Sequence, residues 1–298
     1  MDLVTDKNFN SRYDCIVVWN HGFNFLEDIL SELRRTNNIE IVLIHHHSCR
    51  SMKKLVRNIY SYDYAPLAHL KSKIKYLNHL RPEAFFIFIK NIKPNIDYYG
   101  HGKFRHIESN VIRQFKEKIR ALYNPKDIAG NLSHNHVIHA TDNESQTDSI
   151  LKLIGYKDGI RTLKNEYEIL SNPYHIKEPK KFSIKKIGFE SLLCKNAIGK
   201  NNVHIIPLRD SVQFQSITNI DIYKTYIQKH RGKVLKDDYS SKKYLSMIKD
   251  FKYLNKTNPI NFITVKNYKG KYLIQDGLHR AALELNSGRS SIMACIHE

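Results

Sequence analysis

Apolar runs of strand length alternate with amphipathic stretches along the first half of the chain. Three mainly apolar runs predict strands, at residues 14–19, 39–44 and 84–89, and the last of them is continuously apolar. Stretches with apolar residues at helical spacing predict helices, at residues 25–34, 51–60, 67–80, 107–122 and 145–154. This order of elements predicts a mixed α/β domain, of the α+β kind, over residues 1–155.

The second half contains the same mixture after a change in composition. Pro173, Pro179 and a lysine-rich run at 177–186 predict a linker and connecting segment over residues 156–195. A second α/β domain is expected over 196–298. Its predicted strands lie at 203–208, 259–265, 272–275 and 291–296. Its predicted helices lie at 220–229, 239–251 and 278–285.

The passage from the strand at 272–275 to the last helix carries the clearest chemistry. Gly277 permits a tight turn, and the first amides of the helix, from Leu278 onward, have no backbone partner and attract an anion. Arg280 can bind two phosphate oxygens, and His279 can donate a hydrogen bond or move a proton. Asp276, at the strand end, is placed to hold a metal ion or to accept a proton from a hydroxyl. These residues predict a phosphate site.

The same residues carry a resemblance to a known family. The run Asp-Gly-Leu-His-Arg-Ala-Ala at 276–282, with Ser287-Gly288 and the strand at 291–296, resembles the ParB/sulfiredoxin-like fold. The segments 205–210 and 259–265 are similar to that fold's opening strand and to the strand before the motif. The resemblance covers about the last third of the chain. It implies that the turn binds nucleotide phosphates, as in the members that are small-molecule kinases.

Residue roles follow from this resemblance. It implies ATP or another nucleoside triphosphate or diphosphate, with Mg²⁺ held at Asp276. Either Asp276 or Asp210 would take the proton of the acceptor hydroxyl, and Arg209 would steady an anion. Leu278 stands where sulfiredoxins carry a cysteine, so sulfinic acid reduction is not expected.

A second resemblance lies in the first half. Asn124-Pro125 and the run Val-Ile-His-Ala-Thr-Asp at 137–142 look like the nucleoside diphosphate kinase fold, which is ferredoxin-like, over roughly residues 13–155. It implies that His139 matches the histidine that takes the phosphoryl group. The family's lysine falls at Trp19, however, and one of its arginines falls near Ala129. Because such cations neutralise the transferring group, we expect no general nucleoside diphosphate kinase activity.

Other basic residues of this half can take the place of the missing cations. The sequence predicts a second anion site formed by Arg105, His106, Arg113 and Arg120. The three consecutive histidines at 45–47 invite a metal assignment, but only His45 and His47 share a strand face and no carboxylate pair is near. A strand end is the favoured interpretation of that run.

The net charge and the cysteines limit the class of protein that this sequence can encode. The net charge of +19 and pI of about 9.6 favour an anionic partner, which can be nucleotide, nucleic acid, phosphorylated glycan or membrane, although part of the lysine excess can be compositional. The four cysteines are far apart without a Cys-X-X-Cys pair, which predicts free thiols and no zinc site. With no signal peptide and no membrane span in the sequence, a cytoplasmic location is expected.

The sequence therefore predicts a nucleotide-dependent phosphotransferase that acts on a hydroxyl of a small molecule or sugar. Two alternatives remain open. One is a nucleic-acid-binding or nuclease protein of ParB-like fold, which the basic helix at 107–122 favours. The other is a regulator that binds nucleotide without turnover. The oligomeric state is not determined by the sequence.

Overall fold

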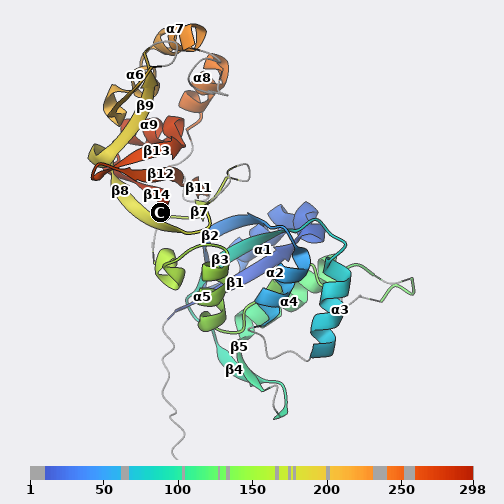
Figure 1. The fold of residues 1–298 in the computed structure, drawn as a ribbon. Helices are drawn as coiled ribbons and strands as arrows, with labels where there is room; N and C mark the ends of the chain where they lie inside the picture. Colours follow the sequence, from blue (N-terminus) through green and yellow to red (C-terminus); the bar gives the residue numbers. More distant parts are fainter. Residues whose placement is uncertain are drawn as a thin grey trace, which may run out of the picture. The chain divides into compact units, whose positions relative to one another are not determined.

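The chain divides into two compact units, Met1–Ile176 and Lys177–Glu298. The structure, a computed structural model, describes residues 11–61, 67–102, 105–126, 128–131, 135–164, 168–173, 176, 179–198, 202–230, 240–251 and 259–297. Figure 1 shows the helices and strands of both units in sequence colours.

The boundary between the units differs from the predicted linker at 156–195. Strands β8 (Phe182–Gly188) and β9 (Leu192–Ala197) lie in that range and belong to the sheet of the C-terminal unit. Phe182 and Ile187 of β8 are buried, whereas Lys185 and Lys186 between them are exposed. Lys185 and Lys186 are solvent-facing residues of a strand. Because lysines are frequent in this segment, its apolar strand positions were not recognised in the sequence.

The N-terminal unit contains a sheet with helices on both faces. Its helices are η1 (Asn20–Phe25), α1 (Leu26–Arg35), α2 (Met52–Tyr60), α3 (Leu67–Leu77), α4 (Asn110–Tyr123), α5 (Glu144–Leu153) and η3 (Gly159–Leu163). Its strands are β1 (Arg12–Trp19), β2 (Ile39–Ser48), β3 (Glu83–Asn91), β4 (Ile96–Tyr99), β5 (His106–Ser109), β6 (Ile138–Ala140) and β7 (Leu170–Ser171).

Strand order identifies the fold of this unit. The strands of this unit lie in the order β7-β2-β3-β1-β6, and β2-β3, β3-β1 and β1-β6 are antiparallel pairs. In the register, Ile16 of β1 faces Ile87 of β3 on one side and Ala140 of β6 on the other. Helix α1 connects β1 to β2, and α4 lies between β3 and β6. This is the ferredoxin-like arrangement, so the fold predicted for this unit is confirmed in its topology.

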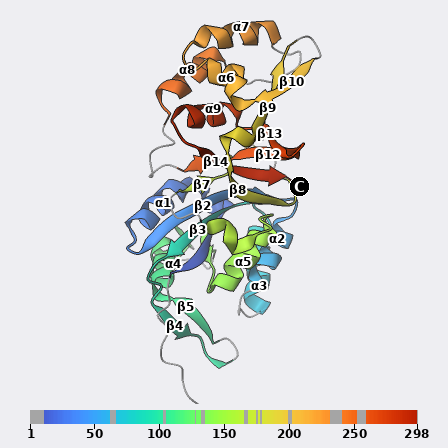
Figure 2. The ribbon, with the colours of Figure 1, turned by 90° about the vertical axis from the view of Figure 1, so that its left-hand side faces the viewer.

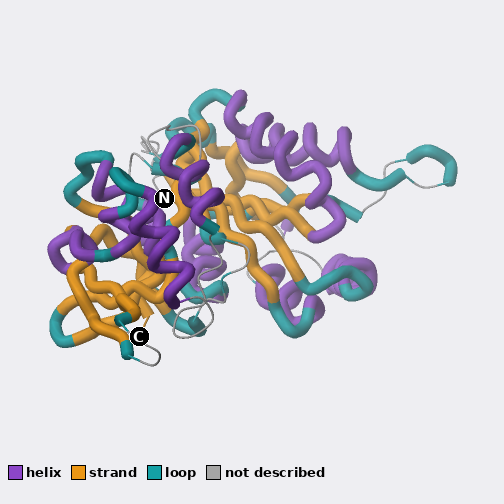
Figure 3. The backbone as a smooth tube through the Cα atoms, turned by 90° about the horizontal axis from the view of Figure 1, so that it is seen from above, coloured by secondary structure: helices purple, strands orange, loops and turns teal. Residues whose placement is uncertain are grey.

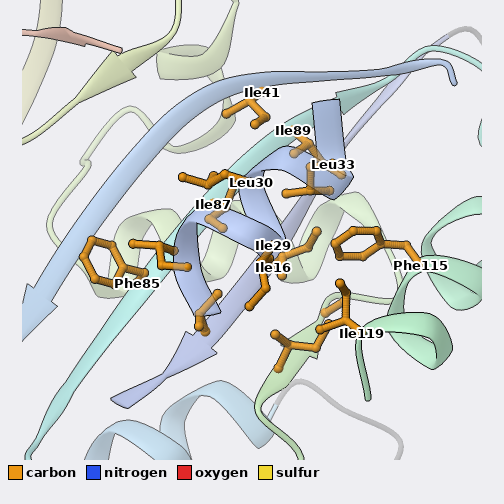
Figure 4. Packing of buried hydrophobic residues seen from close by; sticks show 14 of the residues in the cluster. Ile16, Ile29, Leu30, Leu33, Ile41, Phe85, Ile87, Ile89, Phe115 and Ile119 are labelled. Carbon is orange, nitrogen blue, oxygen red and sulfur yellow. The ribbon is translucent and has the colours of Figure 1, made fainter. Parts of the chain in front are cut away.

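Helices α1 and α4 cover one face of the sheet. Figure 4 shows Ile29 and Leu33 of α1 and Phe115 of α4 packed against Ile16 and other strand residues in one apolar cluster. Burying each such side chain stabilises the fold by about 1.5–3 kcal/mol. On the other face, Trp19 of β1 stacks on Tyr60 of α2, with ring centroids 6.3 Å apart.

Two predicted boundaries in this unit were wrong. The helix predicted over 107–122 begins at Asn110, and the three residues before it belong to β5, which pairs with β4. The Ser109 hydroxyl accepts the amide of Ile112 and caps the helix there. Strand β2 continues to Ser48, beyond the predicted end at residue 44, so the histidines at 45–47 form the last part of the strand and pair with β3.

The C-terminal unit has its own six-stranded sheet, in the order β10-β9-β13-β12-β14-β8. Besides β8 and β9, the strands of this unit are β10 (Val203–Pro207), β11 (Ile260–Asn261), β12 (Ile263–Tyr268), β13 (Lys271–Asp276) and β14 (Ser291–His297), of which β11 lies outside the six-stranded sheet. Its helices are η4 (Phe189–Ser191), η5 (Leu208–Asp210), α6 (Val212–Gln215), α7 (Ile220–His230), α8 (Ser241–Lys249) and α9 (Leu278–Asn286). Figure 2 shows these elements in a view turned by 90° about the vertical axis from that of Figure 1.

Helix α9 is enclosed on two sides. Ala281 and Leu285 pack into the core of the sheet, whereas Leu283 packs with Tyr223 of α7 and Tyr244 of α8. All residues from 280 to 285 are therefore buried, which is expected for a helix with apolar contacts around its circumference. Figure 3 shows the helices of the chain in purple and the strands in orange, seen from above.

Two further sequence predictions concern thiols and membranes. All four cysteines are free, and Cys15, Cys194 and Cys295 are buried. Burial raises the pKa of Cys194 to about 12, so this thiol stays protonated near neutral pH. None of the helices in the described ranges is long and apolar enough to cross a membrane.

Candidate functional site

The turn between β13 and α9 has the geometry that the sequence predicted. Gly277 adopts a left-handed conformation, with φ 86° and ψ 20°, and no side chain caps the amides that follow it. A Cβ added at Gly277 would lie 2.7 Å from both Arg280 Nη2 and Ile263 Cγ2. Only glycine fits this position, because the conformation and the space both exclude a side chain.

Asp276 and Arg280 form an ion pair across the turn. Arg280 Nη2 donates to Asp276 Oδ2 over 2.8 Å. The Arg280 side chain is 11% exposed, whereas that of Asp276 is 44% exposed. The guanidinium is thus held in place within the unit, and the carboxylate remains accessible to solvent.

Two tyrosines contact His279. His279 Nε2 hydrogen-bonds with the Tyr223 hydroxyl over 2.8 Å, and its ring lies edge-on to Tyr244 with centroids 4.6 Å apart. Tyr244 is itself fixed, because its hydroxyl donates to the carbonyl of Gln213 over 2.6 Å. Neither tyrosine was predicted as a site residue from the sequence. The apolar spacing of α7 and α8 indicated only that these segments are helices.

Arg209 and Asp210 lie in η5, which contacts α9. Both side chains are exposed, while Leu208 of the same turn packs in the core that also contains Ala281. The structure therefore brings these two predicted residues to the region of α9 and leaves their charged groups in solvent.

In the N-terminal unit, His139 lies in β6 and is 6% exposed. Its ring packs on Tyr60, with centroids 4.6 Å apart. Burial holds the pKa of His139 well below its usual range, and the positive charges of Lys116, Arg120 and Lys73 lower it further. The imidazole is therefore neutral at physiological pH.

The cations beside His139 are themselves partly withdrawn from water. Burial lowers the pKa of Lys73 to about 7, and the nearby charge of Arg120 adds to this effect. Burial also lowers the pKa of Arg120, whose Nη2 donates to the carbonyl of Ile138 over 3.2 Å. Lys73 carried no sequence signal, because its helix α3 reads as an ordinary basic surface helix.

The four residues predicted as a second anion site have separate partners. The Arg105 guanidinium lies 4.4 Å from the centroid of the Tyr98 ring. Arg113 pairs with Glu117 over 2.9 Å, and His106 lies 3.9 Å from Glu108. Of the four, only Arg120 contributes to the lowered pKa of His139. The cationic partners of His139 are thus Lys116, Arg120 and Lys73.

The histidines of β2 are largely buried. His45 Nδ1 hydrogen-bonds with the Tyr156 hydroxyl over 2.8 Å, and the His45 and His47 rings lie 5.8 Å apart. Burial lowers the pKa of His47 to about 4 and places that of His45 well below its usual range. Both imidazoles are therefore neutral at physiological pH.

Comparison with known proteins gives limited similarity. No family model matches the chain, and no curated protein matches it. Among solved structures, nucleoside diphosphate kinase from Borrelia burgdorferi with bound vanadate and ADP aligns at 15% identity and a TM-score of 0.33, covering 52% of this chain and 94% of that one. Nucleoside diphosphate kinase from Aquifex aeolicus aligns at 10% identity and a TM-score of 0.32, covering 50% and 98%. The ferredoxin-like assignment of the N-terminal unit rests on its strand order.

Proposed function

We propose that the chain is a nucleotide-dependent phosphotransferase and that the turn from Asp276 to Arg280 binds the nucleotide phosphates. The observation that carries this proposal is the uncapped start of α9, entered through a left-handed Gly277 and flanked by Arg280 and His279. Helix amides and a guanidinium together favour a dianionic phosphate. The resemblance of this motif to the small-molecule kinases of the ParB/sulfiredoxin-like fold supports the same assignment.

Each residue of the turn has a definite task in this scheme. Arg280 keeps its bond to Asp276 through Nη2 and binds a phosphate oxygen through its other N–H groups. His279, oriented by Tyr223, donates to a second oxygen or moves a proton. The accessible carboxylate of Asp276 fits Mg²⁺ shared with phosphate oxygens, and the ion would neutralise their charge.

Phosphoryl transfer then needs an acceptor hydroxyl of a small molecule or sugar in line with the γ-phosphorus. Its oxygen bonds to phosphorus as the bond to the β–γ bridging oxygen breaks, and the nucleoside diphosphate leaves. The hydroxyl proton passes to Asp276, or to Asp210 of η5 if the acceptor enters from that side.

Charge removal at the turn tests the proposal. Arg280→Gln removes one charge-assisted contact worth about 1.5–3 kcal/mol, so we expect ATP affinity to fall about 10- to 150-fold. Lys271→Gln, at an exposed position of the same strand, is the matched control and should leave affinity unchanged. Calorimetry with ATP on folded protein measures both. Equal affinities of the two variants would refute the phosphate site.

Asp276→Asn separates binding from turnover. We expect it to leave ATP affinity without metal unchanged or higher, since a negative charge near the phosphates is gone. Phosphate transfer to an acceptor should fall steeply, because the base or the metal ligand is lost. Transfer from radiolabelled ATP to a panel of small-molecule and sugar hydroxyls measures this, and wild-type turnover in Asp276→Asn would contradict its role.

We also propose an anion-binding function for the N-terminal unit. Lys73 and Arg120 are partly buried beside a neutral His139, and the pKa of Lys73 is about 7. Two cations that are partly withdrawn from water are stabilised most when a phosphate group binds beside them. The negative charge of the phosphate would raise the pKa of Lys73 again. Inorganic phosphate should therefore bind with proton uptake near pH 7. Lys73→Gln should abolish that uptake, whereas Lys75→Gln, exposed on the same helix, should keep it.

A further inference from the structure

Three side chains of metal-ligand type meet in the N-terminal unit, beside Lys116, one of the cationic partners of His139. They are His106 and Glu108 of β5 and Asp142, which follows β6. One ligand atom from each lies within 4.8 Å of the other two. His106 and Glu108 are two positions apart on one strand, so their side chains lie on the same face.

Glu108 divides its two oxygens between different neighbours. Lys116 Nζ binds Oε1, whereas Oε2 lies 3.9 Å from His106 Nε2. That separation is too long for a hydrogen bond. It suits two atoms that share one ion, because ligands about 2.0–2.2 Å from a metal lie about 3–4 Å from each other.

The backbone of Asp142 is anchored on both sides. Its amide donates to Gln146 Oε1 over 2.7 Å, and its carbonyl accepts Arg12 Nη1 over 3.1 Å. The Asp142 carboxylate is therefore attached to a backbone position that is held in place. Such preorganisation is what a metal site requires of its ligands.

The carboxylates of the cluster are partly withdrawn from water. Glu108 is 5% exposed. Asp142 is partly buried, and Lys116 is already paired with Glu108, so an added ion must compete with that ammonium group. Two carboxylates withdrawn from water and facing a histidine gain most from a divalent ion between them.

We propose that His106, Glu108 and Asp142 bind one divalent transition-metal ion, of the Mn²⁺ or Zn²⁺ class, in the N-terminal unit. A mixed set of one imidazole and two carboxylates suits these ions, whereas Mg²⁺ and Ca²⁺ prefer oxygen ligands alone. Three protein ligands leave further coordination positions open to water or to another ligand. The site is independent of the proposed phosphotransferase turn, which lies in the other unit.

Metal titration of the full chain tests the site. Free Mn²⁺ is followed by electron paramagnetic resonance, and Zn²⁺ by competition with a chromophoric chelator. We expect one tight ion per chain, with His106→Gln and Asp142→Asn each weakening it at least about tenfold. Lys116→Gln should tighten binding about tenfold or more, because a competing positive charge beside Glu108 is removed.

Matched controls separate this site from the other histidines and carboxylates of the chain. His204→Gln and Glu117→Gln change exposed side chains of the same kinds and should keep the tight ion. Circular dichroism checks that each variant is folded. If one ligand variant does not fold, the other and Lys116→Gln still decide the outcome. Absence of a tight ion in the wild type, or equal affinity in all variants, would show an ion-pair cluster only and overturn the proposal.

Discussion

Replacing Gly277 with alanine perturbs the turn at its most constrained point. An alanine at φ 86° costs about 1–2 kcal/mol for the left-handed conformation alone. Its Cβ would also lie 2.7 Å from Ile263 Cγ2, and Ile263 is fully buried in the core of the sheet. Such overpacking adds about 1–3 kcal/mol. We therefore expect Gly277→Ala to destabilise the C-terminal unit by about 2–5 kcal/mol.

Gly270 provides the matched control for this prediction. It joins β12 to β13 with φ 77°, and a Cβ added there meets nothing within 4 Å. Gly270→Ala therefore has the conformational cost without the steric one, and should destabilise by about 1–2 kcal/mol. The difference between the two variants measures the close approach of Ile263 and Arg280 to the turn.

Urea denaturation distinguishes the two units. Trp19, the single tryptophan, is buried in β1, so its fluorescence follows the N-terminal unit and far-UV circular dichroism follows both. Gly277→Ala should shift the circular dichroism transition and leave the fluorescence transition in place. It should also lower ATP affinity, because any shift of Arg280 disturbs the guanidinium. Equal stability losses for Gly270→Ala and Gly277→Ala would refute the steric argument.

Three further predictions concern histidines. His47 has a folded pKa of about 4, below its ordinary value of 6.5, so its contribution to stability is complete above pH 6.5 and is lost as pH falls toward 4. We expect His47→Gln to flatten the pH dependence of the free energy of unfolding in that range by up to about 3 kcal/mol, and an unchanged slope would contradict this. Tyr223→Phe removes the hydroxyl that orients His279 and should lower phosphate transfer more than ATP affinity; a loss in affinity alone would contradict a positioning role. His139→Ala should keep the fold, and neither wild type nor variant should exchange phosphate generally between nucleoside triphosphates and diphosphates; such exchange, abolished by His139→Ala, would refute this prediction.

Local pattern was sufficient for much of the fold. The apolar runs that became β1 and β3 are long and continuous, so their strand character follows from composition alone. The turn at Gly277 was equally visible, because a strand, an Asp-Gly pair and a helical stretch leave one conformation for the glycine. Strand β8 was missed, since the exposed lysines of a half-buried strand resemble those of a linker.

What surrounds each candidate side chain was decided only by tertiary structure. The sequence places Tyr223 and His279 far apart, and only the packing of α7 against α9 brings the hydroxyl within 2.8 Å of the imidazole. The environment of His139 likewise comes from α3 and α4, whose cations are distant along the chain. Sequence periodicity determines which face of an element is buried. It does not determine which charges meet there, because burial and electrostatic interactions depend on distances that only the assembled fold sets.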